Sequence, residues 1–180
     1  MLIYTSDAWF FDDLFGIEML QNMQYAGRVI QLAEELFGDA IELHFLELLE
    51  LAKSNLPEHS DGRCIYEKFI KPAMVDLTKV AAHYAVSSLF EKYSKRLKIY
   101  CYTIDIEDYQ SFEAGKSKLV IGRCNVTSEI TQESSVMSFG VLHFGDYTLN
   151  AGVKDYQGEE AYQAMVQEIT EAFSAADFPE

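Results

Sequence analysis

The chain has 180 residues, of which 49% are hydrophobic and 13% aromatic, and its formal net charge is −15. This composition argues against disorder and predicts one or two globular domains with a real core. The negative charge argues against nucleic acid and anionic membrane surfaces as partners, because both are polyanionic. Three cysteines without zinc-type spacing fit a reducing compartment. With neither a signal-peptide pattern nor a long apolar run, we expect a cytoplasmic protein that does not span a membrane.

Before residue 95, apolar residues recur every three or four positions, which predicts helices. The first helix should end at Gly38, and Asp39 should cap the second. The apolar stripe of the first consists of Ile17, Leu20, Met23, Gly27, Ile30 and Ala33. The face of the second consists of Ile41, Phe45, Leu48, Leu49 and Ala52.

The remainder of this half contains a loop and two further helical stretches. Residues 54–63, "SNLPEHSDGR", have the Pro, Gly and Ser content of a loop. A third helical stretch should start near Cys64 and break at Pro72, which cannot donate a ladder hydrogen bond. A long fourth stretch follows over residues 73–93. The pattern predicts a helical bundle for the whole half.

After Lys95 the hydrophobic period falls to two, which predicts strands. Four strands are expected, at residues 97–106, 118–127, 135–144 and 147–153. Gly145 and Asp146 suit a two-residue hairpin turn between the last two. An amphipathic helix over Glu159–Phe173 should then cover one face of the sheet. The fold class predicted is α+β, with a helical bundle (residues 1–94) followed by a four-stranded antiparallel meander and a C-terminal helix (residues 95–180).

The sequence does not contain a complete catalytic machine. It has no phosphate-binding glycine loop, no HExxH and no GxSxG motif. His44, His59, His83 and His143 are scattered, so structural roles are favoured for them. The adjacent Asp12 and Asp13 would point about 100° apart on a helix and could not flank one glycosidic bond. We predict no catalytic residue, no metal ligand and no cofactor in this chain.

The opening stretch "TSDAWFFDD" places one tryptophan and two phenylalanines beside three acids. Two interpretations compete for Trp9. The pattern alone favours core packing. The alternative is a binding surface, because an indole stacks on the apolar face of a pyranose and neighbouring carboxylates accept hydrogen bonds from sugar hydroxyls.

The segment "YTSDAWFFDDLFGIEMLQNMQYAGRVIQLAEE" resembles the helical region that follows the catalytic barrel in glycoside hydrolase family 57, closest to the α-amylase or α-mannosidase-like members. The segments "VAAHYAVSSLF", "VIGRCNVTSEIT" and "VLHFGDYTLNAGV" are similar to the same uncharacterised C-terminal domain. The resemblance implies that the reactive glutamate and aspartate lie on a barrel preceding residue 1. It also implies that Ser6, Asp7, Trp9 and Asp12 lie nearest the substrate. The wider family more often has Ser, Asp and Trp contiguous, whereas Ala8 intervenes here.

The resulting hypothesis is a non-catalytic module of a family 57-like carbohydrate-active enzyme, excised from a longer protein. Its partners would be the catalytic barrel of the same parent chain and an α-glucan. The alternatives are a stand-alone module that binds a small ligand, a module that dimerises through the face left uncovered by the barrel, and a small enzyme that uses His83 or His143.

Overall fold

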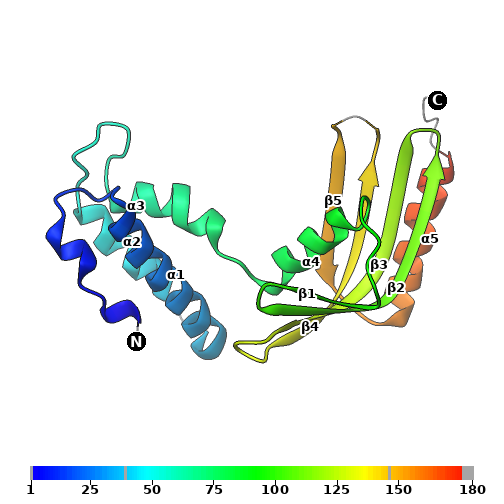
Figure 1. Ribbon diagram of the computed structural model, residues 1–180, viewed down its shortest axis with the longest axis horizontal. Coiled ribbons are helices and arrows are strands. Elements are labelled where there is room, and N and C mark those ends of the chain that lie inside the picture. Colours follow the sequence, from blue (N-terminus) through cyan, green and yellow to red (C-terminus); the bar gives the residue numbers. More distant parts are fainter. Residues whose placement is uncertain (1, 39, 146, 176–180) are drawn as a thin grey trace. The chain divides into compact units, whose positions relative to one another are not determined.

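The computed structural model describes residues 2–38, 40–145 and 147–175 (Figure 1). The chain divides between Met74 and Val75 into two compact units, which we call unit 1 and unit 2. Unit 1 contains the helices of the first part of the chain, and unit 2 contains a sheet with one helix before it and one after it.

Unit 1 is helical, as the periodicity predicts. Its elements are 3-10 turns at Leu2–Tyr4 and Asp7–Phe10, α1 (Ile17–Phe37), α2 (Ile41–Leu51), α3 (Gly62–Ile65), a π-helical turn at Tyr66–Ile70 and a 3-10 turn at Lys71–Ala73. The predicted end of α1 is confirmed, since Gly38 adopts a φ of 68° and its N–H donates to the Glu34 carbonyl. Asp39, the predicted cap of α2, lies outside the described residues. The break at Pro72 is also confirmed.

The core of unit 1 is small and lies where α1, α2 and the Tyr66–Ile70 turn meet. Its buried members are Met23, Leu46, Ile65, Tyr66 and Ile70. A Cβ on Gly27 would lie 2.6 Å from Cε of Met74, so glycine permits this close approach. One prediction is wrong here: α2 buries Leu46, while Leu48 on its expected inner face is exposed.

Unit 2 contains an antiparallel meander between two helices. Its elements are α4 (Leu77–Ser87), β1 (Arg96–Ile99), β2 (Tyr102–Ala114), β3 (Ser117–Ser128), β4 (Ser134–His143), β5 (Leu149–Asp155) and α5 (Glu159–Ala175). The strand order is β1-β2-β3-β4-β5. Sequence and spatial order coincide, which is what short hairpin connections produce.

The sheet has five strands, and the prediction of four is wrong. The stretch expected as a single strand, residues 97–106, contains a tight turn, and Ile99 pairs with Tyr102 across it. Tyr100 adopts a φ of 52° in this turn. Such a conformation is uncommon for a tyrosine. The turn also contains no glycine or asparagine, the residues that usually reveal a turn of this kind in a sequence.

The connection between β4 and β5 also differs from the prediction. β4 ends at His143 and β5 begins at Leu149, so the observed connection is longer than the predicted two-residue turn. The backbone N–H of Phe144 donates to the carbonyl of Thr148 and closes the loop. Asp146, which was expected in the turn, lies outside the described residues.

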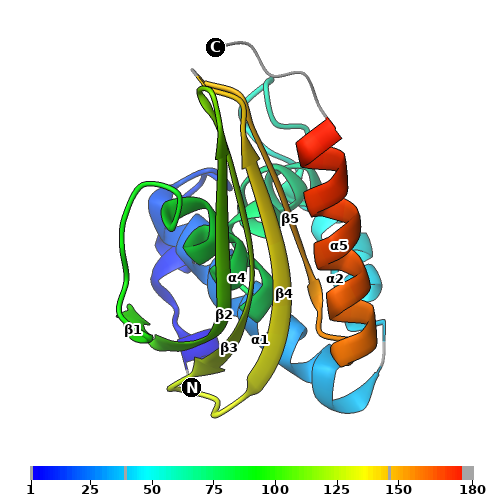
Figure 2. The same ribbon diagram turned by 90° about the vertical axis from the view of Figure 1, so that its right-hand side faces the viewer.

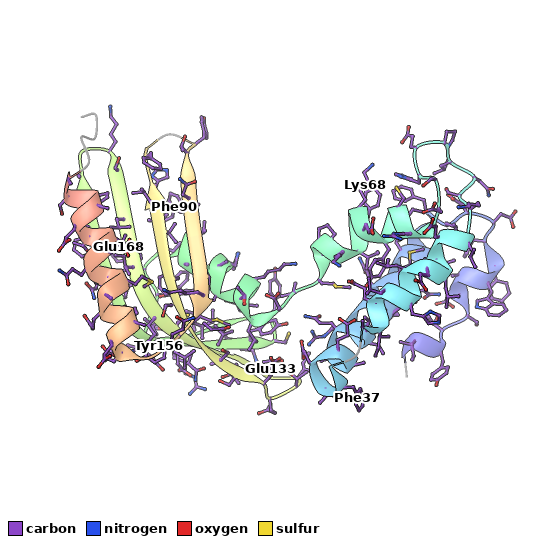
Figure 3. All side chains as sticks on the ribbon, turned by 180° about the vertical axis from the view of Figure 1, so that it is seen from behind. Phe37, Lys68, Phe90, Glu133, Tyr156 and Glu168 are labelled. Carbon is purple, nitrogen blue, oxygen red and sulfur yellow. The ribbon has the colours of Figure 1, made fainter. Side chains whose placement is uncertain are left out.

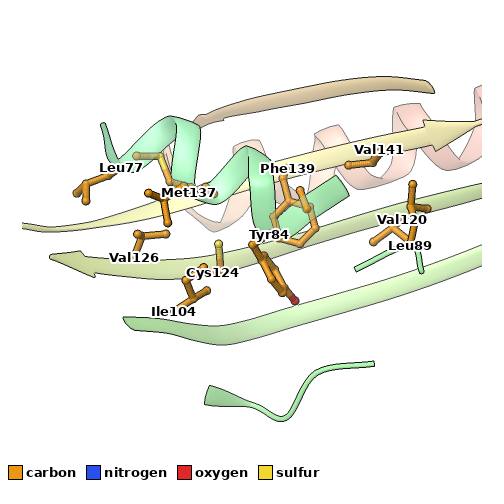
Figure 4. Packing of buried hydrophobic residues seen from close by; sticks show 13 residues of the cluster. Leu77, Tyr84, Leu89, Ile104, Val120, Cys124, Val126, Met137, Phe139 and Val141 are labelled. Carbon is orange, nitrogen blue, oxygen red and sulfur yellow. The ribbon is translucent and has the colours of Figure 1, made fainter. Parts of the chain in front are cut away.

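The two faces of the sheet are covered by different helices (Figure 2). On one face α4 packs Tyr84 and its apolar neighbours against the fully buried Ile104, Val120 and Phe139 (Figure 4). On the other face α5 packs Ile169 and Phe173 near Leu119 and Ile121, a cover that the sequence predicts. The sequence assigned the stretch of α4 to the helical bundle and set a boundary between residues 94 and 95, whereas α4 belongs to the unit of the sheet.

Candidate functional site

The acidic and aromatic opening of unit 1 forms a short 3-10 turn over Asp7–Phe10. The backbone N–H of Trp9 donates to the carbonyl of Ser6 over 3.0 Å. The hydroxyl of Thr5 donates to the Asp7 carboxylate over 2.9 Å. Ser6, Asp7 and Trp9 therefore lie on one turn of backbone.

Only one residue of this turn is buried. Ala8 points inward, whereas the Trp9 side chain is 88% exposed and Phe10 is 80% exposed. The core packing that the pattern alone favours for Trp9 is therefore wrong. The other exposed apolar side chains between residues 3 and 17 are Ile3, Tyr4, Phe10, Phe11 and Ile17. We call these residues together with Trp9 the aromatic surface.

Asp12 follows the turn and is exposed, and its backbone carbonyl accepts a 2.6 Å hydrogen bond from the amide of Asn55. Next to it, the Asp13 carboxylate accepts from the backbone N–H of Phe15. In the described part of the chain, the side chains of Ser6, Trp9 and Asp12 make no hydrogen bond or ion pair. Their polar atoms are thus available to an external group.

Beneath this opening, three rings hold the chain in place. Phe15 packs 4.3 Å from His59 and 4.9 Å from Phe69, measured between ring centroids. His59 is buried, and its Nδ1 has no hydrogen-bond partner within the described residues. Together with the hydrogen bond from Asn55, the ring contacts fasten the opening segment to the loop that follows α2. The backbone is therefore anchored at Asp12 and Phe15, directly after residues 3–11 of the aromatic surface.

Unit 2 contains a polar cluster that the sequence analysis missed. It is centred on Arg123 of β3, whose Nε lies 2.9 Å from Glu107 and whose Nη1 lies 2.7 Å from Glu159. The guanidinium also lies over the rings of Tyr156 and Tyr162, at 4.7 and 5.1 Å from their centroids. Tyr156 lies beside the first turn of α5 (Figure 3).

A β-bulge explains how these charges gather. The register of β2 shifts between Ile106 and Asp108, so Glu107 and Asp108 both lie opposite Arg123. Burial alone would raise the pKa of Asp108, but hydrogen bonds from Tyr162, Gln110 and the Tyr109 backbone lower it below its ordinary value. The only sequence signal is the acidic pair that interrupts the alternation in "DIEDYQ".

The contacts of this cluster indicate an anchor for α5. The carboxylate of Glu159 accepts hydrogen bonds from Gln163, Arg123 and Tyr156, and these lower its pKa to about 2. The Tyr162 hydroxyl donates to Asp108 over 2.7 Å. The carboxylates of Asp108 and Glu159 each accept hydrogen bonds from within the cluster, which indicates a structural role for it.

The remaining candidates for chemistry lie apart from one another. His83 is exposed on α4, and the ring of His143 packs against Phe90. Cys124 is fully buried, and burial raises the pKa of its thiol to about 12. Within the described ranges, no three His, Cys, Asp or Glu side chains gather so that they could hold a metal ion. None of the described helices is long and apolar enough to cross a membrane.

Comparisons with known proteins give one match. The family model of the domain of unknown function DUF3536 matches residues 1–180, which is the entire chain. No curated protein and no solved structure matches.

Proposed function

Because the chain belongs to the DUF3536 family, whose domains accompany glycoside hydrolase family 57 proteins, we propose that it is a non-catalytic module of a family 57-like carbohydrate-active enzyme. In this role unit 1 packs on the catalytic barrel and contributes to its α-glucan cleft. The reactive carboxyl groups lie on the barrel, and this chain supplies a surface beside them.

The observation that carries the proposal is the exposure of the aromatic surface. Isolated exposed apolar residues are common, but several large ones within one short segment favour a contact with another molecule. Tyr4, Trp9 and Phe10 are each at least 80% exposed and lie within seven consecutive positions. The anchored backbone beneath them makes the group a surface of defined shape, which lowers the entropy cost of binding.

The composition of this surface supports contact with a sugar as well as with protein. The indole of Trp9 offers a flat apolar face, and the carboxylates of Asp7 and Asp12 are acceptors for sugar hydroxyls. Ser6 adds a hydroxyl that both donates and accepts. A module that helps to form the edge of an α-glucan cleft needs this pairing of an aromatic platform with short polar side chains.

The first experiment tests the contact with the barrel. The 180-residue chain is mixed with a purified family 57 barrel that lacks its own module, and binding is measured by calorimetry. Trp9→Ala combined with Phe10→Ala should weaken binding by at least about 100-fold, which corresponds to about 2.8 kcal/mol. The matched control is Tyr147→Ala, an exposed aromatic residue of unit 2. Equal affinity of the double variant and the control would refute the interface.

The second experiment tests the sugar contact and the absence of catalysis. Trp9 is the single tryptophan, so its fluorescence reports on this surface alone. Maltooligosaccharides should change the emission of the 180-residue chain, and Asp7→Asn should weaken that response. The isolated chain should not hydrolyse α-glucan. Turnover by the isolated chain would refute the non-catalytic role.

A second candidate follows from the same exposure: the aromatic surface is the contact of a homodimer. Apolar surface of this kind also drives self-association. Light scattering at several concentrations distinguishes the two. The dimerising module would be favoured by two results together. The dimer dissociates in the variant with Trp9→Ala and Phe10→Ala, and the dimer of the unmodified chain persists when the barrel is added.

A further inference from the structure

One face of the sheet in unit 2 is covered only in part. α5 packs on β2 and β3, where Phe112, Leu119 and Ile121 lie close to Phe173. Beside it, β4 and β5 form the floor of an open groove of about 680 Å³. A volume of this size lies within the range of ligand sites in proteins, about 300–1,000 Å³.

Part of the floor of this groove is bare backbone, and Ser138, Leu142 and Asn150 also line the groove. Gly140 of β4 and Gly152 of β5 are direct partners across the two strands. A Cβ on Gly140 would lie 3.5 Å from Ile169 of α5, which places both glycines on the face of that helix. Glycine weakens a strand interior, so two paired glycines require a reason.

The fold itself does not supply that reason. Neither glycine adopts a positive φ. A Cβ on Gly152 would meet nothing within 4 Å, and the contact of a Cβ on Gly140 with Ile169 is an ordinary van der Waals distance. Glycines that neither turn the chain nor admit a neighbouring side chain mark a place where another molecule approaches the backbone.

The walls of the groove are mostly apolar. Met165, Ile169 and Ala172 of α5 form one side, and Leu142 and Phe144 lie toward the end of β4. Lys154 of β5 is the cationic residue among the described lining residues. Its ammonium group makes no ion pair in the described part of the chain. The groove thus combines a long apolar surface with one cationic side chain, Lys154 of β5, and one anionic side chain, Glu168 of α5.

We propose that this groove binds a linear aliphatic carboxylate. The chain of the ligand lies over Gly140 and Gly152 and against Met165 and Ile169, and its carboxylate lies near the ammonium group of Lys154. A polyhydroxylated ligand is disfavoured, because the mostly apolar lining would leave many of its hydroxyls without partners. Three turns of a partner helix would occupy more than about 1,000 Å³ by the dimensions of an α-helix, which exceeds the groove.

The main test is calorimetric titration of the 180-residue chain with dodecanoate. The unmodified chain should bind, and Gly152→Leu should weaken binding by at least about tenfold, because the new side chain occupies the floor. This variant should fold normally, since its site is open and its φ is not strained. Absence of binding by the unmodified chain, or equal affinity of a folded Gly152→Leu variant, would overturn the proposal.

The contact with Lys154 needs a second comparison. Lys154→Gln should weaken dodecanoate binding by a factor of up to about five, the range of an exposed ion pair, and should leave 1-dodecanol binding unchanged. Lys92→Gln, at an exposed position outside the groove, is the matched control. Equal effects of the two substitutions on dodecanoate would overturn the assigned orientation.

The position of the bound dodecanoate is determined by NMR from the resonances of methionine methyl groups. Dodecanoate should shift the methyl resonance of Met165, which lines the groove, and leave that of Met137, which is buried on the opposite face of the sheet with α4. Met165→Leu and Met137→Leu assign the two signals. A shift at Met137 without one at Met165 would place the ligand elsewhere and refute the groove. A peptide helix that displaces dodecanoate and shifts Met165 more strongly would refute the aliphatic ligand.

Discussion

Unit 2 has a larger set of buried apolar side chains than unit 1. In unit 2 the largest ones, such as Tyr84 and Phe139, are fully buried between the sheet and α4. In unit 1 the core contains few buried side chains, while Trp9, Phe37 and Leu51 are more than 70% exposed. Unit 2 builds its core from its own elements, and unit 1 leaves several large apolar side chains exposed, as the proposed contact with another molecule requires.

The largest expected effect tests the core of unit 2. Phe139→Ala removes a fully buried ring that packs edge-on against Tyr84, with centroids 5.5 Å apart, and should lower the free energy of unfolding by about 3–5 kcal/mol. Phe37→Ala in unit 1, at an exposed position, should change it by less than about 0.5 kcal/mol. Urea unfolding followed by circular dichroism measures both. Similar losses in the two variants would contradict the comparison.

The next effect compares two glycines of the same sheet. A Cβ on Gly122 would lie 2.5 Å from the Phe139 ring and 2.6 Å from the Asp108 carbonyl, so Gly122→Ala should cost about 1–3 kcal/mol. Gly152→Ala adds a Cβ in open space and should be neutral or slightly stabilising. Thermal unfolding of the two variants checks this order, and a larger loss from Gly152→Ala would contradict the packing of the sheet.

A smaller effect depends on pH and concerns the anchor of α5. The pKa of Glu159 is about 2 in the folded chain, against 4.5 as its ordinary value, chiefly through hydrogen bonds from Gln163 and Arg123. Because the folded pKa is the lower one, the contribution of Glu159 is present above pH 4.5 and is lost as pH falls toward 2. The protection factors of the amides in the first turns of α5, measured by hydrogen exchange, should fall as the pH decreases across this window. Glu159→Gln should remove that dependence, and an unchanged profile would contradict the anchor.

The smallest effect on stability is expected at the aromatic surface. Trp9→Ser should change the free energy of unfolding by less than about 0.5 kcal/mol, because the indole leaves no cavity behind. The same substitution should reduce the affinity for the barrel. Chemical denaturation of the variant gives the measurement, and a loss above about 1.5 kcal/mol would show that Trp9 serves the interior of unit 1.

Much of the fold follows from the sequence, because hydrophobic periods report which face of an element is buried. They predict α1 with its end at Gly38, and strands β3 and β4 to within a residue. They do not report which neighbour covers that face, so the stretch of α4 could not be assigned to the sheet. The turn at Tyr100 was missed because its conformation depends on the surrounding sheet.

The sequence identifies the residues of the candidate site, but it does not reveal that their side chains are exposed. The pattern "AWFF" is compatible with a core helix, and only the inward position of Ala8 turns Trp9 and Phe10 to the outside. The Arg123 cluster depends on pairing between strands and on a bulge at Glu107, and such long-range registers leave little trace in local sequence.

The position of α4 decides where unit 2 can be cut for separate production. A fragment that starts at residue 95 would contain every strand but would leave Val120, Val126 and Phe139 open to water on one side. Such a fragment would aggregate through that side. A fragment that starts at residue 75 retains α4, so that β3 is covered by a helix on each face of the sheet.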